Sequence, residues 1–104
     1  RDYYASRGLG DVYKRQALTE PAEDLSQKYI RVLKDGFASM DMAQNILVVR
    51  TVSGMAMAVA AALDALNFHE IVGTIAGDDT IMCAVRSVEE NIRLMDRLRK
   101  MVGK

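Results

Sequence analysis

Two adjacent acidic residues, Asp78 and Asp79, interrupt an apolar stretch and are the first residues that could do chemistry. They follow Gly77, and such a triplet is typical of a turn, because Gly and Asp tolerate positive φ angles and bond their own backbone. One acid is enough for a turn, however, and neighbouring carboxylates repel unless a cation lies near them. The pair therefore leaves two interpretations open: a hairpin turn, or a site for a metal ion, a basic side chain or a cationic ligand.

A third acid, Asp64, is the only charge in the alanine-rich segment 55–66. The Ala and Met content of this segment predicts a helix. Asp64 lies near its C-terminal end, where the helix dipole disfavours a carboxylate. Asp64 is therefore either an exposed helix end or a third acid that faces the same cation.

The remaining reactive residues indicate no catalytic set. His69 is the only histidine, and its position in a predicted loop without a partner at metal-ligand spacing predicts a solvent-exposed residue. Cys83 falls in a predicted strand and is expected to be a buried apolar residue. We find no P-loop, GxGxxG, HExxH or Ser/His/Asp set, and so predict that the chain is no enzyme. An enzyme that holds a divalent ion with the Asp pair is disfavoured, because no further acids or histidines cluster with it.

The elements that must position these residues follow from periodicity and turn signals. A helix is predicted at 22–34 and a second one at 55–66. Strands are predicted at 37–44, 46–52, 71–76 and 80–85, the last two as a hairpin around the Asp pair. Both hairpin strands are apolar on both faces, which predicts central places in a sheet covered on both sides.

The last predicted helix, from Val88 to Met101, begins with the capping box of Ser87 and Glu90. Its apolar face is expected to contain Ile92, Met95, Leu98 and Met101, and its solvated face Arg93, Arg97 and Lys100. The element order predicts an α+β fold: a two-layer α/β sandwich with a mainly antiparallel four-stranded sheet and two helices, in the order strand-strand-helix-strand-strand-helix.

Composition points to a subunit of a larger assembly. The chain has 104 residues, of which 50% are hydrophobic, and residues 55–63 contain no polar side chain. A helix that is apolar all round must be buried all round, so we expect one sheet to cover one side of this helix and another subunit to cover the other. Zero net charge disfavours nucleic-acid binding by a basic surface. One cysteine, no signal peptide and no apolar run long enough to span a membrane favour a cytoplasmic protein.

Residues 1–16 differ in composition from the rest, with three of the four tyrosines and a charge of +2. Basic and aromatic residues permit a nucleic-acid arm, and the lack of periodicity permits a disordered tail. The string "YASRGLGDVYKRQ" resembles a translated adapter peptide that recurs at the ends of metagenomic gene fragments. We therefore expect a foreign or disordered tail.

The segments "NILVVRTVSG", "LDAL" and "IVGTIAGDDTI" resemble the C-terminal domain of the bacterial arginine repressor family, which includes arginine-responsive activators. The resemblance runs from about Ala17 to the C-terminus, and "GTIAGDDT" is its most specific part. "ALTEP" is similar to the last strand of the preceding winged-helix domain. The resemblance implies that residues 17–34 are the end of that domain with a linker helix, and that residues 35–104 bind arginine and form the oligomer.

The family's properties then become expectations for this chain. L-arginine is the expected ligand, with no metal, and Asp78, Asp79 and Asp64 are its expected partners. Met57 stands where many members have Gln, and Ser53 stands where Pro is common. The expected assembly is a trimer, or a hexamer as a dimer of trimers, with operator DNA bound only through an N-terminal domain that this chain lacks.

The resemblance implies an arginine-sensing oligomerisation domain of a transcriptional regulator of arginine biosynthesis and catabolism. The alternative is another amino-acid-binding regulatory module, of the type appended to metabolic enzymes. That alternative does not require a basic ligand, so titration with a panel of amino acids separates the two.

Overall fold

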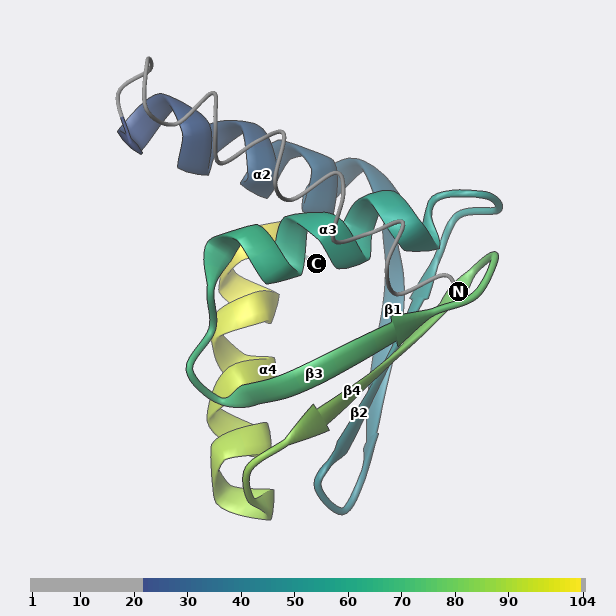
Figure 1. Cartoon of the computed structure of the whole chain (residues 1–104), viewed down its shortest axis with the longest axis vertical. Helices are drawn as coiled ribbons and strands as arrows, with labels where there is room; N and C mark the ends of the chain where they lie inside the picture. Colours follow the sequence, from purple (N-terminus) through teal and green to yellow (C-terminus); the bar gives the residue numbers. More distant parts are fainter. Residues whose placement is uncertain (1–21, 104) are drawn as a thin grey trace.

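The computed structural model describes residues 22–103, with side chains described from Leu25 onward (Figure 1). Its elements are α2 (Ala22–Gly36), β1 (Phe37–Ala43), β2 (Ile46–Thr51), α3 (Ala56–Leu66), β3 (Ile71–Ala76), β4 (Thr80–Val85) and α4 (Val88–Val102). The strands form a four-stranded sheet in the order β1-β2-β4-β3, and every neighbouring pair is antiparallel. The predicted α+β fold and element order are confirmed. The expected tail at 1–16 and the expected strand "ALTEP" lie outside the described residues.

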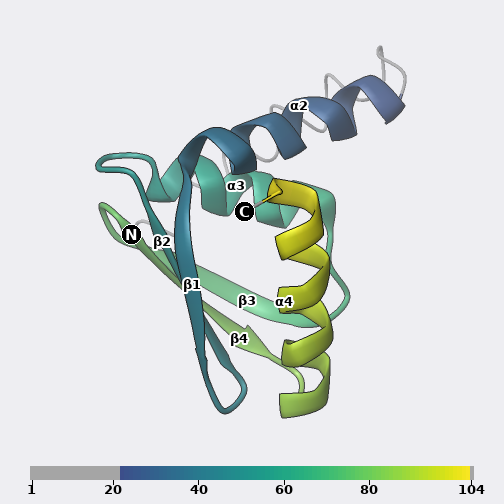
Figure 2. The same ribbon diagram turned by 180° about the vertical axis from the view of Figure 1, so that it is seen from behind.

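The two helices α3 and α4 cover one face of the sheet. In Figure 1 strands β3 and β4 lie in front of α4, and in the reverse view of Figure 2 α4 lies in front of them. Alternate residues of the two central strands point toward the helices and are buried: Leu47, Val49, Ile81, Cys83 and Val85. This period of two places the core between the sheet and the helices.

Helix α2 packs on α3 from the side away from the sheet, which corrects the expectation that another subunit covers that side. Leu25, Tyr29 and Leu33 of α2 are buried in the same core as the sheet residues. The approach at the end of α2 is close, because a Cβ added to Gly36 would lie 2.5 Å from a methyl group of Val59 in α3. Gly36 therefore permits close packing of α2 on α3 within one chain.

Strand β3 is an edge strand, so the prediction that both hairpin strands are central is wrong for β3 and right for β4. Among the described residues, no helix covers the second face of the sheet. The side chains of Val72, Ile75 and Met82 there are 63%, 69% and 52% exposed. The apolar surplus of the chain thus lies on the open sheet face and not on α3.

Helix α4 begins as predicted, with the amide of Glu90 donating to the side chain of Ser87 at 3.1 Å. Its buried face consists of Asn91, Leu94, Met95, Leu98 and Val102. The predicted face is therefore rotated: Met95 and Leu98 are buried, but Ile92 is 55% exposed and Met101 only partly buried. The reason is Asn91, a polar residue that is fully buried because its amide donates to the carbonyl of Gln44. No helix in the described range is long and apolar enough to cross a membrane.

Candidate functional site

The acidic loop between β3 and β4 is held mainly by backbone hydrogen bonds. The amide of Gly77 donates to the carbonyl of Thr80 at 2.8 Å, which closes the hairpin. The amides of Thr51 and Ala56 donate to the carbonyls of Asp79 and Asp78 at 2.8 and 3.2 Å. The loop is therefore fixed against the end of β2 and the start of α3 whichever side chains it carries.

The turn predicted at the Asp pair is confirmed, but its expected physical reason is not. Among the described non-glycine residues only Gln44 and Asn67 have positive φ angles, so Asp78 and Asp79 do not. The φ angle of Gly77 is not positive either. The hairpin closes through the hydrogen bonds above. Two acidic residues are therefore not explained by backbone geometry.

The two carboxylates of the loop have different surroundings. Oδ1 of Asp79 accepts from the hydroxyl of Thr80 at 2.9 Å, and its Oδ2 lies 3.5 Å from the guanidinium of Arg50. Asp78 is exposed, and its Oδ2 accepts from the hydroxyl of Ser53 at 3.4 Å. Both partners of the ion pair are about half exposed, so the pair contributes little to stability. Each carboxylate keeps lone pairs for a further donor.

Met57 lies in the first turn of α3, one residue after the amide that bonds the acidic loop. Its side chain is partly buried and packs against the hydrophobic core. A thioether offers only a weak acceptor, so this position supplies packing near the loop and no strong polar contact.

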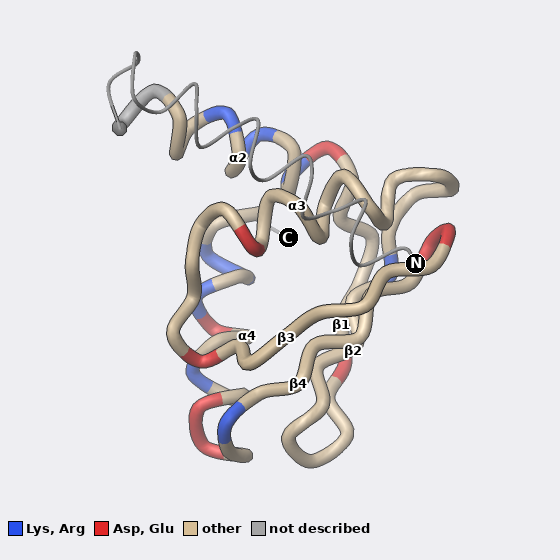
Figure 3. Tube along the Cα trace, viewed as in Figure 1, with Lys and Arg blue, Asp and Glu red and all other residues tan. Residues whose placement is uncertain are grey.

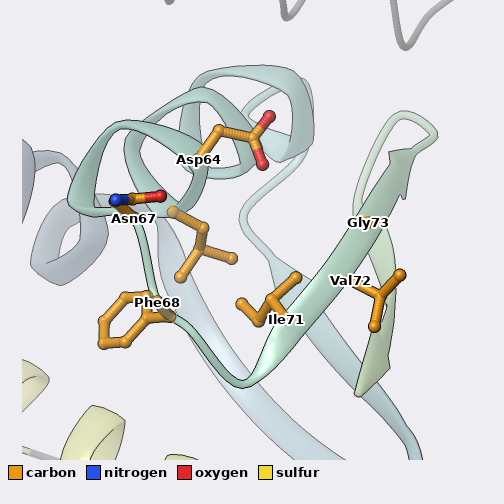
Figure 4. Close-up of a pocket in the computed structure, with 7 residues that line it drawn as sticks. Asp64, Asn67, Phe68, Ile71, Val72 and Gly73 are labelled. Atoms are coloured by element: carbon orange, nitrogen blue, oxygen red, sulfur yellow. The ribbon is translucent and has the colours of Figure 1, made fainter. Parts of the chain in front are cut away.

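Asp64 lies near the other end of α3, beside β3. Its Oδ1 accepts a hydrogen bond of 3.1 Å from the hydroxyl of Thr74, which is only 4% exposed. Figure 4 shows Asp64 at the rim of a cavity between the end of α3 and the start of β3. The cavity has a volume of about 180 Å³ and is lined by Leu63, Asp64, Asn67, Phe68, Ile71, Val72 and Gly73. The C-terminal end of α3 and the carboxylate of Asp64 both lie beside this cavity, and both favour a positively charged group there.

The field of Asp64 also reaches Cys83. Burial, and to a smaller extent the charge of Asp64, raise the pKa of the Cys83 thiol to about 12. The thiol is therefore neutral at physiological pH and has no nucleophilic character. The prediction of a buried, inert cysteine is confirmed, and His69 is exposed in its loop as predicted.

The structure therefore places the predicted acids at two ends of one helix. Ala56, which bonds Asp78, and Asp64 are eight residues apart in α3, which is about 12 Å of helix rise. Figure 3 shows this separation as one acidic position toward the end of α3 and another at the tip of the β3–β4 hairpin. Asp78 and Asp79 are brought together, whereas Asp64 is not brought to them within this chain.

Sequence reasoning missed the side chains that hold these acids, namely Thr74, Arg50 and Ser53. The register of the sheet gives the signal for Arg50, because Arg50 pairs with Thr80 next to the acidic loop. Thr74 has a weaker signal, since a hydroxyl in an otherwise apolar strand needs a hydrogen-bond partner when it is buried.

Acids of this kind define a candidate binding site for a ligand with positive charge. Within residues 22–103 we find no group of three or more His, Cys, Asp or Glu side chains that could hold a metal ion.

Comparison with known proteins shows similarity to one family. The family described as "Arginine repressor, C-terminal domain" matches residues 33–100. An arginine repressor of Lachnoclostridium phytofermentans is 65% identical over 86 residues, which are 83% of this chain and 57% of that protein. An arginine repressor of Lachnospira eligens is 59% identical over 85 residues, 82% of this chain and 56% of that protein. One of Ruminiclostridium cellulolyticum is 39% identical over 90 residues, 86% of this chain and 60% of that protein.

The chain belongs to the arginine repressor family, and the matched region is the family's C-terminal domain. It spans less than two thirds of the length of these curated relatives.

Proposed function

We propose that this chain is the arginine-sensing oligomerisation domain of a transcriptional regulator, and that it is no enzyme. The observation that carries the proposal is the placement of carboxylates near both ends of α3, in a chain whose relatives are named arginine repressors. L-arginine carries a guanidinium and an α-ammonium group at opposite ends of a flexible chain. Each of these positive groups can pair with a carboxylate.

The chemistry of each acid supports a share in recognition. A planar guanidinium offers five donors that fit carboxylates, two at a time. Asp78 and Asp79 together offer such oxygens at the hairpin tip, and Asp64 takes a cationic group beside its cavity. Met57 lies near the loop without a strong polar contact, so the acids carry the recognition.

The open face of the sheet supports oligomerisation. One row of residues crosses all four strands of the sheet, and each member is the direct partner of the next: Asp41, Val48, Met82 and Ile75. All of this row except Asp41 is apolar. A surface with such exposed apolar side chains is typical of an interface. Homo-oligomers, as trimers or as hexamers made of two trimers, are the assemblies that we propose.

The whole protein would act on operator DNA in the cytoplasm. It would bind the DNA through a domain that corresponds to the part of the relatives that this chain does not span. Arginine would bind one arrangement of the assembly more tightly than another. Such a difference in affinity is what coupling between ligand binding and DNA binding requires. We also propose the domain limits: a foreign or disordered tail at 1–16, the end of a winged-helix domain with a linker helix at 17–34, and the arginine-binding oligomerisation domain at 35–104. Packing of α2 on α3 makes the linker helix a part of the same core.

Titration calorimetry with a panel of amino acids tests the proposal. L-arginine is expected to bind, and neutral or acidic amino acids are expected to give no heat of binding. Preferential binding of a neutral amino acid would favour a different regulatory module.

A further inference from the structure

The acidic loop already holds a guanidinium group of its own chain. Among residues 22–103, Arg50 is the one base that forms an ion pair with an acid of this loop, and its guanidinium lies 3.5 Å from Oδ2 of Asp79. The other oxygen of the same carboxylate, Oδ1, accepts from the hydroxyl of Thr80 at 2.9 Å. Both oxygens of Asp79 therefore have a donor or a cation of the chain beside them.

The backbone fixes Arg50 next to the loop. Arg50 is the direct partner of Thr80 in the pairing of β2 with β4. The amide of the next residue, Thr51, donates to the carbonyl of Asp79 at 2.8 Å. The start of the Arg50 side chain is thus held beside Asp79 by the sheet. Its guanidinium can turn toward solvent, because the side chain is 57% exposed.

The two acids of the loop differ in this respect. Within the described residues Asp78 has no basic partner, and its Oδ2 accepts only a long bond of 3.4 Å from the hydroxyl of Ser53. A guanidinium pairs with a carboxylate best through two parallel bonds, one to each oxygen. A second cation at the same carboxylate is repelled by the first. Full pairing of a cationic ligand with Asp79 therefore requires that Arg50 move away.

We infer that Arg50 is an internal competitor, whose guanidinium pairs with Asp79 and is displaced when a cationic ligand binds there. The inference rests on the proposed function, which supplies L-arginine as the ligand. The guanidinium groups of Arg50 and of L-arginine are the same functional group, so binding exchanges one for the other at Asp79. An ion pair between two half-exposed side chains is weak. Arg50 thus lowers the affinity of the site without closing it.

The test begins with Arg50→Gln in the chain of 104 residues. This change removes the charge and keeps a polar side chain. Calorimetry should show that L-arginine binds roughly two- to fivefold more tightly, the equivalent of up to about 1 kcal/mol, because exposed ion pairs have this strength. Arg93→Gln makes the same change at an exposed position of α4 and should leave the affinity unchanged. Circular dichroism compares the fold of both variants with the wild type.

Two double variants separate competition at Asp79 from a general effect of lost positive charge. On the background of Asp79→Asn, Arg50→Gln should no longer change the affinity for L-arginine, because the carboxylate that Arg50 holds is gone. On the background of Asp78→Asn, it should still tighten binding roughly two- to fivefold. An equal gain on both backgrounds would overturn the inference, since the charge of Arg50 would then act at long range only.

Unchanged or weaker binding of L-arginine by Arg50→Gln would also overturn the inference. Agmatine, which is arginine without its carboxylate, shows the reason for weaker binding. If Arg50→Gln lost affinity for arginine but not for agmatine, Arg50 would pair with the carboxylate of the ligand and would not compete with its guanidinium. In these outcomes the wild type binds arginine and the proposed function stands. Absence of arginine binding in both the wild type and the variant would refute the proposed function together with the inference.

Discussion

Acids lie near both ends of α3, but the two regions are fastened in different ways. At the hairpin end, the carbonyls of Asp78 and Asp79 accept from backbone amides. At the other end, side chains add to backbone bonds such as that from the Arg86 amide to the Glu70 carbonyl. Thr74 donates to Asp64, Phe68 is buried in the core, and Arg97 pairs with Glu70. Side chains at the hairpin end can therefore change without altering the loop, whereas those at the Asp64 end combine structure with recognition.

Neutralising both acids of the hairpin is expected to have the largest effect. Each charge-assisted hydrogen bond is worth about 1.5–3 kcal/mol, so Asp78→Asn or Asp79→Asn alone should weaken arginine binding roughly 10- to 150-fold. The double variant should show no measurable binding by calorimetry. Its free energy of unfolding should stay within about 0.5 kcal/mol of the wild type, because the backbone bonds remain.

Asp96→Asn is the matched control for this charge change, because Asp96 is an exposed acid in α4 that pairs with Arg99 of the same helix, away from the acidic loop and from the open sheet face. It should leave arginine affinity unchanged. If both single variants at the hairpin bound arginine like the wild type, the Asp pair would have no role beyond the turn.

At the opposite end, Phe68→Ala is expected to destabilise the whole domain. Phe68 is 7% exposed, and the Arg97 guanidinium lies 5.0 Å from the centre of its ring. Removal of a buried aromatic ring costs about 3–5 kcal/mol. Thermal or denaturant unfolding measures this loss. Ile92→Ala, at an apolar position of α4 that is 55% exposed, should change stability far less; equal effects would mean that Phe68 is no part of the core.

Glu70→Gln should have a smaller, pH-dependent effect. Burial raises the pKa of the Glu70 carboxyl, but a backbone hydrogen bond and Arg97 outweigh burial and hold that pKa below 4.5. A lowered folded-state pKa stabilises the fold above the unfolded value, and this contribution is lost as the pH falls through the folded pKa. We expect Glu70→Gln to cost about 1 kcal/mol at pH 7, because Arg97 is half exposed. Unfolding curves should show a difference in the free energy of unfolding between variant and wild type at pH 7, and this difference should disappear in acid. A difference that is the same at both pH values would exclude the ion pair as its cause.

The smallest effect is expected for Met57→Gln. Met57 packs against the core without a strong polar contact, so an amide at this position should leave arginine affinity unchanged or tighten it. Calorimetry on the single variant measures this. A marked loss of affinity would show that the thioether packing of Met57 supports the acidic loop.

The sequence predicted the class of fold and the hairpin at the Asp pair, because strand composition, turn residues and capping signals are local. It could not predict that β3 is an edge strand, because an apolar strand is as compatible with an intersubunit contact as with a central place. The predicted apolar face of α4 was rotated from the observed one, because the burial of Asn91 depends on the carbonyl of Gln44, which is far away in the sequence. The acids themselves were found, but Arg50 depends on the register between distant strands, and Thr74 depends on the packing of β3 against α3.

Calorimetric titration of the chain with L-arginine and L-citrulline tests the central claim most directly. Citrulline keeps the shape of arginine but replaces the guanidinium with a neutral ureido group. If the carboxylates around α3 recognise charge, arginine binds and citrulline binds at least roughly tenfold more weakly, the equivalent of about 1.4 kcal/mol. Equal binding of the two ligands would contradict recognition of the guanidinium by Asp78, Asp79 and Asp64.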